Sequence, residues 1–234
     1  MTHRKGFFIT ATGTNIGKTS VTRLLAATLS QTHTVTYMKP IQTGCTYNAN
    51  RELYAPDFDV LRTTGITLTQ QTELHVPYCF EPACSPHLAA NMDGVTIDLQ
   101  HINNCFHTII KQLGETTVCL VEGAVGVYVP LNAADTMFDL MYLLGLPVIV
   151  VTSAGLGTLN HTFLTLEALR SRNLPVAAVI MNNAQNCAED FMYDDNRETI
   201  RNAALPALFL DLPYGNAPMP FIKEFCNELM QQLV

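Results

Sequence analysis

The chain has 234 residues, of which 48% are hydrophobic and 14% are charged. This composition is typical of a globular protein, predicts a single domain over residues 1–234, and excludes a disordered or fibrous chain. Thirteen Lys and Arg residues against twenty Asp and Glu give a net charge of -7, which argues against a broad surface for nucleic acid or anionic membrane.

Apolar runs of strand length alternate with stretches at helical spacing. The expected buried strands are Gly6–Ala11, Val35–Met38, Thr117–Val121, Pro147–Thr152, Val176–Met181 and Ala207–Leu210. Helices are expected after Gly17 to about Ser30, over Leu156–Arg170 and over Phe221–Leu233. The buried face of the second helix is predicted from three- and four-residue steps to be Leu156, Leu159, Phe163, Leu166 and Leu169. This order predicts a three-layer α/β fold, a mostly parallel sheet with helices on both faces.

The stretch between Thr43 and Asn91 is irregular, with four prolines, and is too long for an ordinary connection. Ligands of parallel sheets gather beyond the carboxyl ends of the strands, so we expect this segment to help roof a site there.

No apolar run approaches the ~18–20 residues of a membrane span, and the first residues lack the pattern of a signal peptide. The seven cysteines are odd in number and form no CxxC pair, which suggests neither a disulfide framework nor a zinc site. A cytoplasmic, enzyme-like domain is the expectation from these features.

A phosphate-binding loop is the most informative motif. Residues 10–19 read TATGTNIGKT, a small-residue loop between a buried strand and a helix. Its backbone N–H groups would surround phosphate oxygens, Lys18 would reach the β- and γ-phosphates, and Thr19 would offer a hydroxyl to Mg²⁺. Thr12 replaces the glycine that usually opens this pattern, and Gly13 is the nearest glycine. Strand, loop and helix together favour a phosphate-loop NTPase over an ordinary helix start.

Three further polar residues stand at the ends of predicted strands. Glu122 could reach the metal of a phosphate-loop site; the alternative, a solvated acid at a strand end, weakens once Lys18 and Thr19 are accepted as part of the loop. Lys39, followed by Pro40, would place a second ammonium near the loop. Asn182 carries both a donor and an acceptor for a base edge, and a turn asparagine is an equal alternative from the residues alone.

Several separated segments then occur in a fixed order over about residues 6–215. They are TATGTNIGKT, Tyr37–Gly44, Asp57 with Leu61, Pro77–Phe80 with Ser85–His87, Val121–Gly126 with Pro130-Leu131, Leu156–His161, Asn182, and Leu212-Pro213. Together they resemble dethiobiotin synthetase, the ATP-dependent cyclo-ligase of biotin synthesis. The SPH and LGxxNH segments are more selective than the phosphate loop.

The resemblance implies that 7,8-diaminononanoate, CO₂ and ATP give dethiobiotin, ADP and phosphate, through a carbamate and a carbamic-phosphoric anhydride. It also implies Mg²⁺ as the cofactor and a cytoplasmic homodimer without nucleic-acid or membrane partners. By resemblance Thr19, Asp57 and Glu122 would hold Mg²⁺. Lys18 and Lys39 would neutralise the transferring phosphoryl group.

The resemblance implies further roles for matching residues. Thr14 and Thr43 would position the diamine and its carbamate, with Thr14 counted beside the two lysines as catalytic. A helix start near a dimer interface would bind the substrate carboxylate through Gly157, Thr158 and Asn160. Nucleotide contacts would come from Asn15, Ile16, Gly17, Lys18, Thr19, Ser20, Asp57, Glu122, Gly123, Ala124, Val125, Asn182 and Asn183. The far wall of the base pocket would be Pro213, Tyr214 and Gly215.

The chain departs from the family pattern at Ala11, a usual glycine, at Asn15, often an acid, and at Val125, which interrupts a usual Gly-Ala-Gly-Gly. The class is expected to survive these departures, while substrate affinity is expected to be affected. For the tyrosine that the family often sends across the dimer interface, Tyr193 and Phe191 are both candidates.

Two rival enzymes or binders share the phosphate loop. A cobyrinic-acid-type amidotransferase synthetase would need a glutaminase half, for which 234 residues leave no room. A partitioning ATPase would carry an extra lysine early in the loop, at the position of Gly13. Such proteins often also have an amphipathic membrane-targeting tail, whereas Phe221–Val234 contains Lys223 as its only basic residue. A bare binding module would not need both Lys18 and Lys39.

Overall fold

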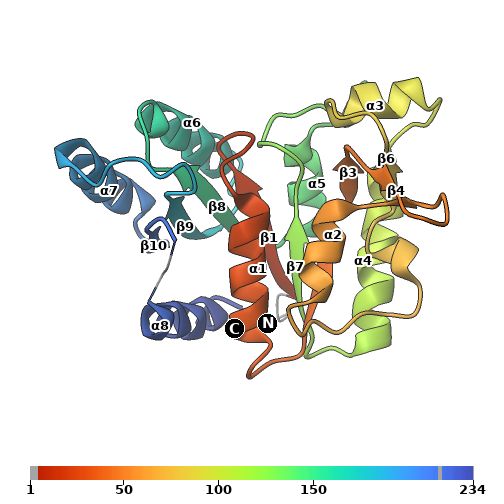
Figure 1. The fold of residues 1–234 in the computed structure, drawn as a ribbon, viewed down its shortest axis with the longest axis horizontal. Coiled ribbons are helices and arrows are strands. Elements are labelled where there is room, and N and C mark those ends of the chain that lie inside the picture. Colours follow the sequence, from red (N-terminus) through yellow and green to blue (C-terminus); the bar gives the residue numbers. More distant parts are fainter. Residues whose placement is uncertain (1–4, 216–217, 234) are drawn as a thin grey trace.

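Six parallel strands form the central sheet of the computed structural model, which describes residues 5–215 and 218–233. From one edge to the other they are β10 (Leu208–Leu212), β9 (Val176–Asn182), β8 (Val148–Ser153), β1 (Gly6–Ala11), β7 (Val118–Glu122) and β2 (Val35–Met38). The expected strands match these within two residues at either end. Because every strand is parallel, their carboxyl ends share one edge of the sheet, with the loop after β1 near its centre (Figure 1).

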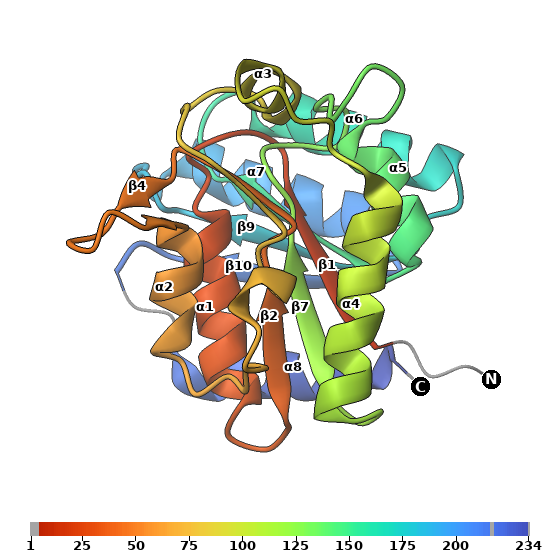
Figure 2. The ribbon, with the colours of Figure 1, turned by 90° about the vertical axis from the view of Figure 1, so that its right-hand side faces the viewer.

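Helices cover both faces of the sheet. One face carries α1 (Lys18–Leu29), α2 (Pro56–Arg62) and α8 (Met219–Gln231). The other carries α4 (Leu99–Leu113), α5 (Met137–Leu144), α6 (Thr158–Ser171) and α7 (Phe191–Ala204). Figure 2 shows α1 and α2 on one side of the strands and α4 and α5 on the other. The predicted three-layer α/β fold is therefore confirmed. In the described part of the chain, no helix combines the length and apolar content needed to cross a membrane.

The segment between β2 and α4 forms a roof from small elements. Its strands are β3 (Ile41–Thr43), β4 (Thr46–Tyr47), β5 (Leu53–Tyr54) and β6 (Tyr78–Phe80), and its other elements are α2, a 3-10 turn η1 (Thr72–Leu74) and α3 (Pro86–Met92). β3 pairs in parallel with β6, and β4 pairs antiparallel with β5. The segment expected to be irregular thus contains ordered short elements, and α3 lies at the same end of the molecule as the loop after β1 (Figures 1 and 2).

One disulfide joins Cys45, just after β3, to Cys79 in β6. The expectation of no disulfide is therefore wrong for this pair. Cysteine counting failed because the two residues are 34 positions apart and become neighbours only through the pairing of β3 with β6.

The buried face of α6 also differs from the predicted one. Leu166 and Leu169 are buried as expected, but Leu156, which precedes the helix, is 91% exposed, and Phe163 is also exposed. The polar residues that are buried instead are Thr158, Thr162 and Thr165. The prediction from leucine spacing was wrong because the hydroxyl groups buried under α6 form hydrogen bonds there. Threonine can therefore take the place of leucine on the face of α6 that packs against the sheet.

Candidate active site at the carboxyl edge of the sheet

A cavity of about 360 Å³ lies at the carboxyl ends of β1 and β2. Its lining comes from four segments that are separated in the sequence. The lining residues are Gly13, Thr14, Asn15, Ile16, Gly17, Lys18, Thr19, Ser20, Lys39, Ile41, Gln42, Thr43, Asp57, Ala124 and Val125. The structure therefore brings together the predicted loop, the second lysine and the candidate substrate threonines.

The phosphate loop, which follows β1, is braced from the end of β9, two strands away in the sheet. Gly17 precedes α1 in the left-handed conformation, with φ of 84°. A Cβ at this position would lie 2.4 Å from Nδ2 of Asn182, so the position requires glycine. That same amide donates to the carbonyl oxygen of Ile16 at 2.8 Å. Asn182 thus holds the loop with its amide nitrogen, and its amide oxygen accepts no hydrogen bond from the residues that the structure describes.

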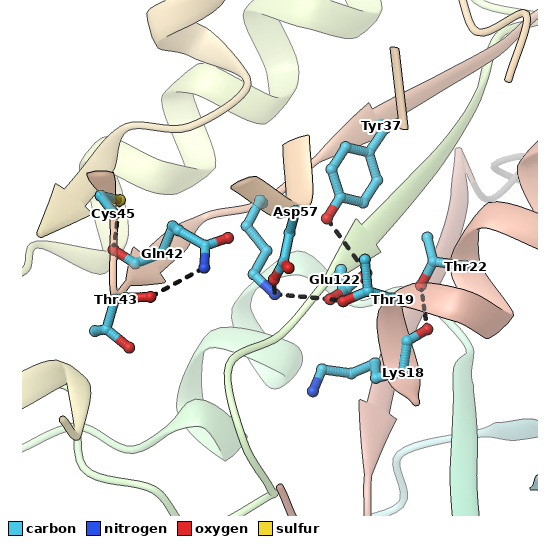
Figure 3. A network of polar contacts seen from close by, with 10 residues as sticks. Lys18, Thr19, Thr22, Tyr37, Gln42, Thr43, Cys45, Asp57 and Glu122 are labelled. Atoms are coloured by element: carbon cyan, nitrogen blue, oxygen red, sulfur yellow. Dashed lines mark hydrogen bonds and ion pairs between the residues drawn. The ribbon is translucent and has the colours of Figure 1, made fainter. Parts of the chain in front are cut away.

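A polar network joins the loop to β7 and the roof (Figure 3). The ammonium of Lys39 donates to Oε1 of Glu122 at 2.7 Å and pairs with Oδ2 of Asp57 at 2.8 Å. Thr19 donates its hydroxyl to the same Oε1 of Glu122 at 2.8 Å, and Tyr37 donates to Oε2 at 3.2 Å. The three expected metal ligands therefore meet in one network with the Lys39 ammonium.

Burial sets the electrostatics of this network. Glu122 is fully buried and Lys39 nearly so. Burial alone would lower the pKa of Lys39, but the carboxylates of Glu122 and Asp57 outweigh it and raise that pKa above its usual value. For Lys18, burial and then the charge of Lys39 lower the pKa to about 8. A triphosphate would supply Lys18 with a further anionic partner.

The donor set of this network fits Mg²⁺. A hydroxyl and two carboxylates are the hard oxygen ligands that Mg²⁺ prefers, and Mg²⁺ usually completes its shell with phosphate oxygens and water. The oxygens of Asp57 and Glu122 already converge on a cation, since both lie within hydrogen-bond distance of the Lys39 ammonium. The residues present therefore suit the metal that the phosphate loop implies.

A second cavity lies beside the first, on the far side of the loop. It has a volume of about 350 Å³ and is lined by Ser20, Val21, Leu24, Asn182, Leu212, Pro213, Gly215 and Met219. Of the expected base-pocket residues, Tyr214 is exposed and outside this lining. Asn183 is also outside, because its amide nitrogen donates to the carbonyl of Cys187 and its oxygen accepts from the N–H of Cys187.

The candidate carboxylate site lies apart from the phosphate loop, at the start of α6. Gly157 precedes the helix with φ of 89°, and both Gly157 and Asn160 are exposed. Thr158 is buried, and its hydroxyl donates to the carbonyl of Ser153 at 2.6 Å. Its N–H donates to the carbonyl of Gly155 at 3.2 Å, so neither its hydroxyl proton nor its N–H is free for a carboxylate, and the exposed Gly157 and Asn160 remain as the accessible residues.

The departures from the family pattern have structural outcomes. Asn15 and Val125 both adopt the left-handed region, with φ of 58° and 55°. This conformation suits asparagine and is strained for a β-branched valine, in a segment where the family usually has glycine. Tyr193 is buried and donates to Asp211 at 2.6 Å, whereas Phe191 is 86% exposed. Of the two candidates for a residue across an interface, only Phe191 is accessible.

Three residues of the site were not predicted. Ile41 and Gln42 line the cavity, and Nε2 of Gln42 donates to the carbonyl of Thr43 at 3.0 Å. Tyr37 contacts Glu122 from β2, two residues before Lys39. The period-two alternation of a strand would have placed Tyr37 and Lys39 on one face, so that signal was present in the sequence.

The fold and this site define a phosphate-loop nucleotide-binding protein. The model of a family described as AAA domain matches residues 5–216. Among solved structures, the MinC:MinD cell division protein complex of Aquifex aeolicus is similar with a TM-score of 0.54 at 14% identity, covering 98% of this chain and 95% of that one. At this identity the likeness shows the fold alone.

Within that class, the chain belongs to the family of ATP-dependent dethiobiotin synthetases. It is 37% identical over 223 residues to the enzyme of Halalkalibacterium halodurans, covering 90% of this chain and 85% of the relative. It is 37% identical over 219 residues to that of Aeromonas salmonicida, covering 92% and 93%. The resemblance read from the motifs is confirmed.

Proposed function

We propose that the site performs the ligase reaction of its family, in which 7,8-diaminononanoate, CO₂ and ATP give dethiobiotin, ADP and phosphate. Membership in the dethiobiotin synthetases supports the substrates. The observation that carries the proposal for the site is the network of Thr19, Lys39, Asp57 and Glu122 at the end of a phosphate loop. It combines cationic groups with metal-binding oxygens where a γ-phosphate would lie.

The nucleotide would lie across both cavities. Its phosphates would be held by the N–H groups of the loop and by Lys18, and its base would enter the second cavity beside Asn182. The free oxygen of the Asn182 amide suits the amino group of adenine. Thr19, Asp57 and Glu122 would hold Mg²⁺, which supplies charge neutralisation for phosphoryl transfer.

The chemistry needs alignment and charge neutralisation rather than a side-chain nucleophile. One amine of the substrate adds to CO₂ and loses a proton, which gives a carbamate. A carbamate oxygen attacks the γ-phosphorus and ADP leaves; the second amine then attacks the carbonyl carbon, and phosphate and a proton leave as the ureido ring closes. Lys18 and Lys39 would stabilise the charge on the transferring group, and the hydroxyls of Thr14 and Thr43 would orient the carbamate.

The other end of the diamine substrate would be bound at the start of α6. The exposed Gly157 and Asn160 would take its carboxylate, because a helix N-terminus attracts anions. Leu156 and Leu164, 91% and 63% exposed, give this region an apolar surface that would be covered in the proposed homodimer. A single domain over residues 1–234, in the cytoplasm, completes the proposal.

The rival function is a nucleotide switch, since the solved structures that share the fold include a cell division protein complex and a putative plasmid partition protein. The experiment that separates the two measures ATP consumption with diaminononanoate and bicarbonate present, and with each omitted in turn. We expect consumption to require both and to match the dethiobiotin formed. Hydrolysis that ignores both substrates would favour the switch.

A further inference from the structure

We propose that Thr152 is a positioning residue that couples the phosphate loop to the start of α6, so that nucleotide and diamine strengthen each other's binding. The proposal rests on the proposed function, which puts the diamine carboxylate at α6. It explains why α6 turns threonines, and not the expected leucines, toward the sheet.

Thr152 lies at the carboxyl end of β8 and is fully buried. Its hydroxyl oxygen has three partners: Thr12 at 3.3 Å, Thr158 at 2.9 Å and Thr162 at 2.6 Å. Thr12 belongs to the phosphate loop, whereas Thr158 and Thr162 belong to the first turns of α6. One oxygen atom thus joins the two candidate subsites.

The directions of these bonds follow from counting protons. A hydroxyl donates one hydrogen bond and accepts two. Thr12 donates to Thr152, and Thr158 donates its own proton to the carbonyl of Ser153 at 2.6 Å. Thr158 must therefore accept the proton of Thr152, and Thr162 must donate to Thr152. The Thr152 hydroxyl is then fully used, so movement of either subsite breaks a buried hydrogen bond.

Backbone contacts hold both ends of this hydroxyl chain close to Thr152. The N–H of Thr12 donates to the carbonyl of Val151 at 3.0 Å, beside the hydroxyl bond. On the other side, the turn before α6 is held by Asn196 of α7, which donates to the carbonyl of Ala154 at 3.0 Å, and by the N–H of Thr158, which donates to Gly155. A shift at the loop is therefore passed to the helix start through few atoms.

The coupling is measured as a change in affinity. A non-hydrolysable ATP analogue with Mg²⁺ is titrated calorimetrically into the protein with and without saturating diaminononanoate, and the diamine is titrated with and without the analogue. We expect each ligand to increase the affinity of the protein for the other by the same factor, about five-fold or more, because the thermodynamic linkage between two binding sites is reciprocal. In Thr152→Val, which has nearly the same shape, the factor should fall below about two-fold, and Thr152→Ser should restore it.

Two further variants separate coupling from stability. Thr36→Val replaces a buried threonine of β2 whose hydroxyl has no hydrogen-bond partner within the described residues, and the coupling factor should stay at the wild-type value. Thr12→Val removes the hydroxyl at the loop end of the hydrogen-bonded series, where the side chain is half-buried. It should also abolish the coupling, and it provides the test if Thr152→Val does not fold.

The proposal is overturned if neither ligand changes the affinity for the other in the wild-type protein. It is also overturned if Thr152→Val and Thr12→Val keep the wild-type coupling factor, or if Thr36→Val lowers the coupling factor as much as they do. Formation of dethiobiotin by the wild-type protein is assayed in parallel. Product without coupling refutes this inference alone, whereas failure to form product refutes the proposed function.

Discussion

Lys39 occupies the space between two carboxylates that the proposed metal would also use. In the free protein its ammonium compensates the charge of Glu122, which is fully buried. Removing one partner of such a buried pair typically costs about 3–5 kcal/mol, because the other charge is left uncompensated. A bound triphosphate would offer the ammonium a second set of anionic partners. Lys39 would therefore neutralise negative charge both in the free protein and in the nucleotide-bound protein.

For Lys39→Ala we expect ATP binding to persist and dethiobiotin formation to fall by at least about 100-fold, because the lost charge acts on the transferring phosphoryl group. The melting temperature of the variant should also fall. Adding Mg²⁺ should raise the melting temperature more in the variant than in the wild type, because Asp57 and Glu122 have lost the Lys39 ammonium as their cation. Turnover assays and thermal melts with and without Mg²⁺ check both expectations.

The matched control is Lys111→Ala, which removes an exposed lysine from α4. Its turnover and its response to Mg²⁺ should equal those of the wild type. Near-normal turnover of Lys39→Ala would remove Lys39 from the catalytic set.

His75 supports the end of β2, which Lys39 follows. It is fully buried, with Nδ1 2.6 Å from the carbonyl oxygen of Tyr37 and Nε2 3.1 Å from the N–H of Thr69. Both contacts are satisfied by the neutral ring, which donates through Nδ1 and accepts through Nε2. Its own carbonyl accepts from the N–H of Lys39 at 2.8 Å. The roof is therefore tied to the end of β2 through this residue.

Burial lowers the pKa of His75 below its usual value of 6.5. At a pH between the pKa of His75 in the folded protein and 6.5, the unfolded chain binds a proton at this histidine that the folded protein does not. The contribution of His75 to the free energy of unfolding is therefore complete above pH 6.5 and is lost as the pH falls toward the pKa in the folded protein. The free energy of unfolding in urea should therefore decrease between pH 7.5 and pH 5.5. In His75→Gln it should be lower at pH 7.5 but depend less on pH.

The control for this prediction is His33→Gln, which changes an exposed histidine and should leave the free energy of unfolding at pH 7.5 at the wild-type value. An unchanged pH dependence in His75→Gln would show that other groups govern acid stability.

The sequence predicts elements best where burial dictates composition. Parallel strands buried on both faces are continuous apolar runs, so β1 and β2 were predicted to the residue. The α6 face was not, because Thr158 and Thr162 are buried through hydrogen bonds to a residue of another element. The loop lysine and Glu122 were predicted from local motifs, and strand alternation could have added Tyr37, whereas Gln42 joins the site through packing that no motif encodes.

At the scale of the whole molecule, the two proposed substrate subsites belong to different parts of the sheet edge. The phosphate loop follows β1, and the carboxylate site follows β8, the next strand. α6 begins at the end of the molecule where α3 lies (Figures 1 and 2). Both helices carry exposed apolar residues, such as Leu164 and Met92. A second copy covering this end would close the substrate site.

For Leu164→Glu we expect the oligomer to dissociate, because a charge replaces an exposed apolar side chain in the proposed interface. Light scattering should give twice the chain mass of 25.8 kDa for the wild type and the single-chain mass for the variant. The KM for the diamine should rise more than the KM for ATP.

Phe221→Glu provides the control, because Phe221 is equally exposed but lies on α8. It should remain a dimer with unchanged kinetics. A monomeric wild type with full activity would contradict the proposed assembly.

The most direct test follows one oxygen atom from CO₂ into the phosphate released from ATP. Freshly dissolved CO₂ labelled with oxygen-18 is supplied with the diamine and ATP, and the phosphate is examined by mass spectrometry before the label exchanges with water. Attack by a carbamate on the γ-phosphorus predicts a single labelled oxygen in each phosphate and the other label in the ureido carbonyl. Phosphate whose new oxygen comes from water would contradict the account, because the site would then hydrolyse ATP without activating a carbamate.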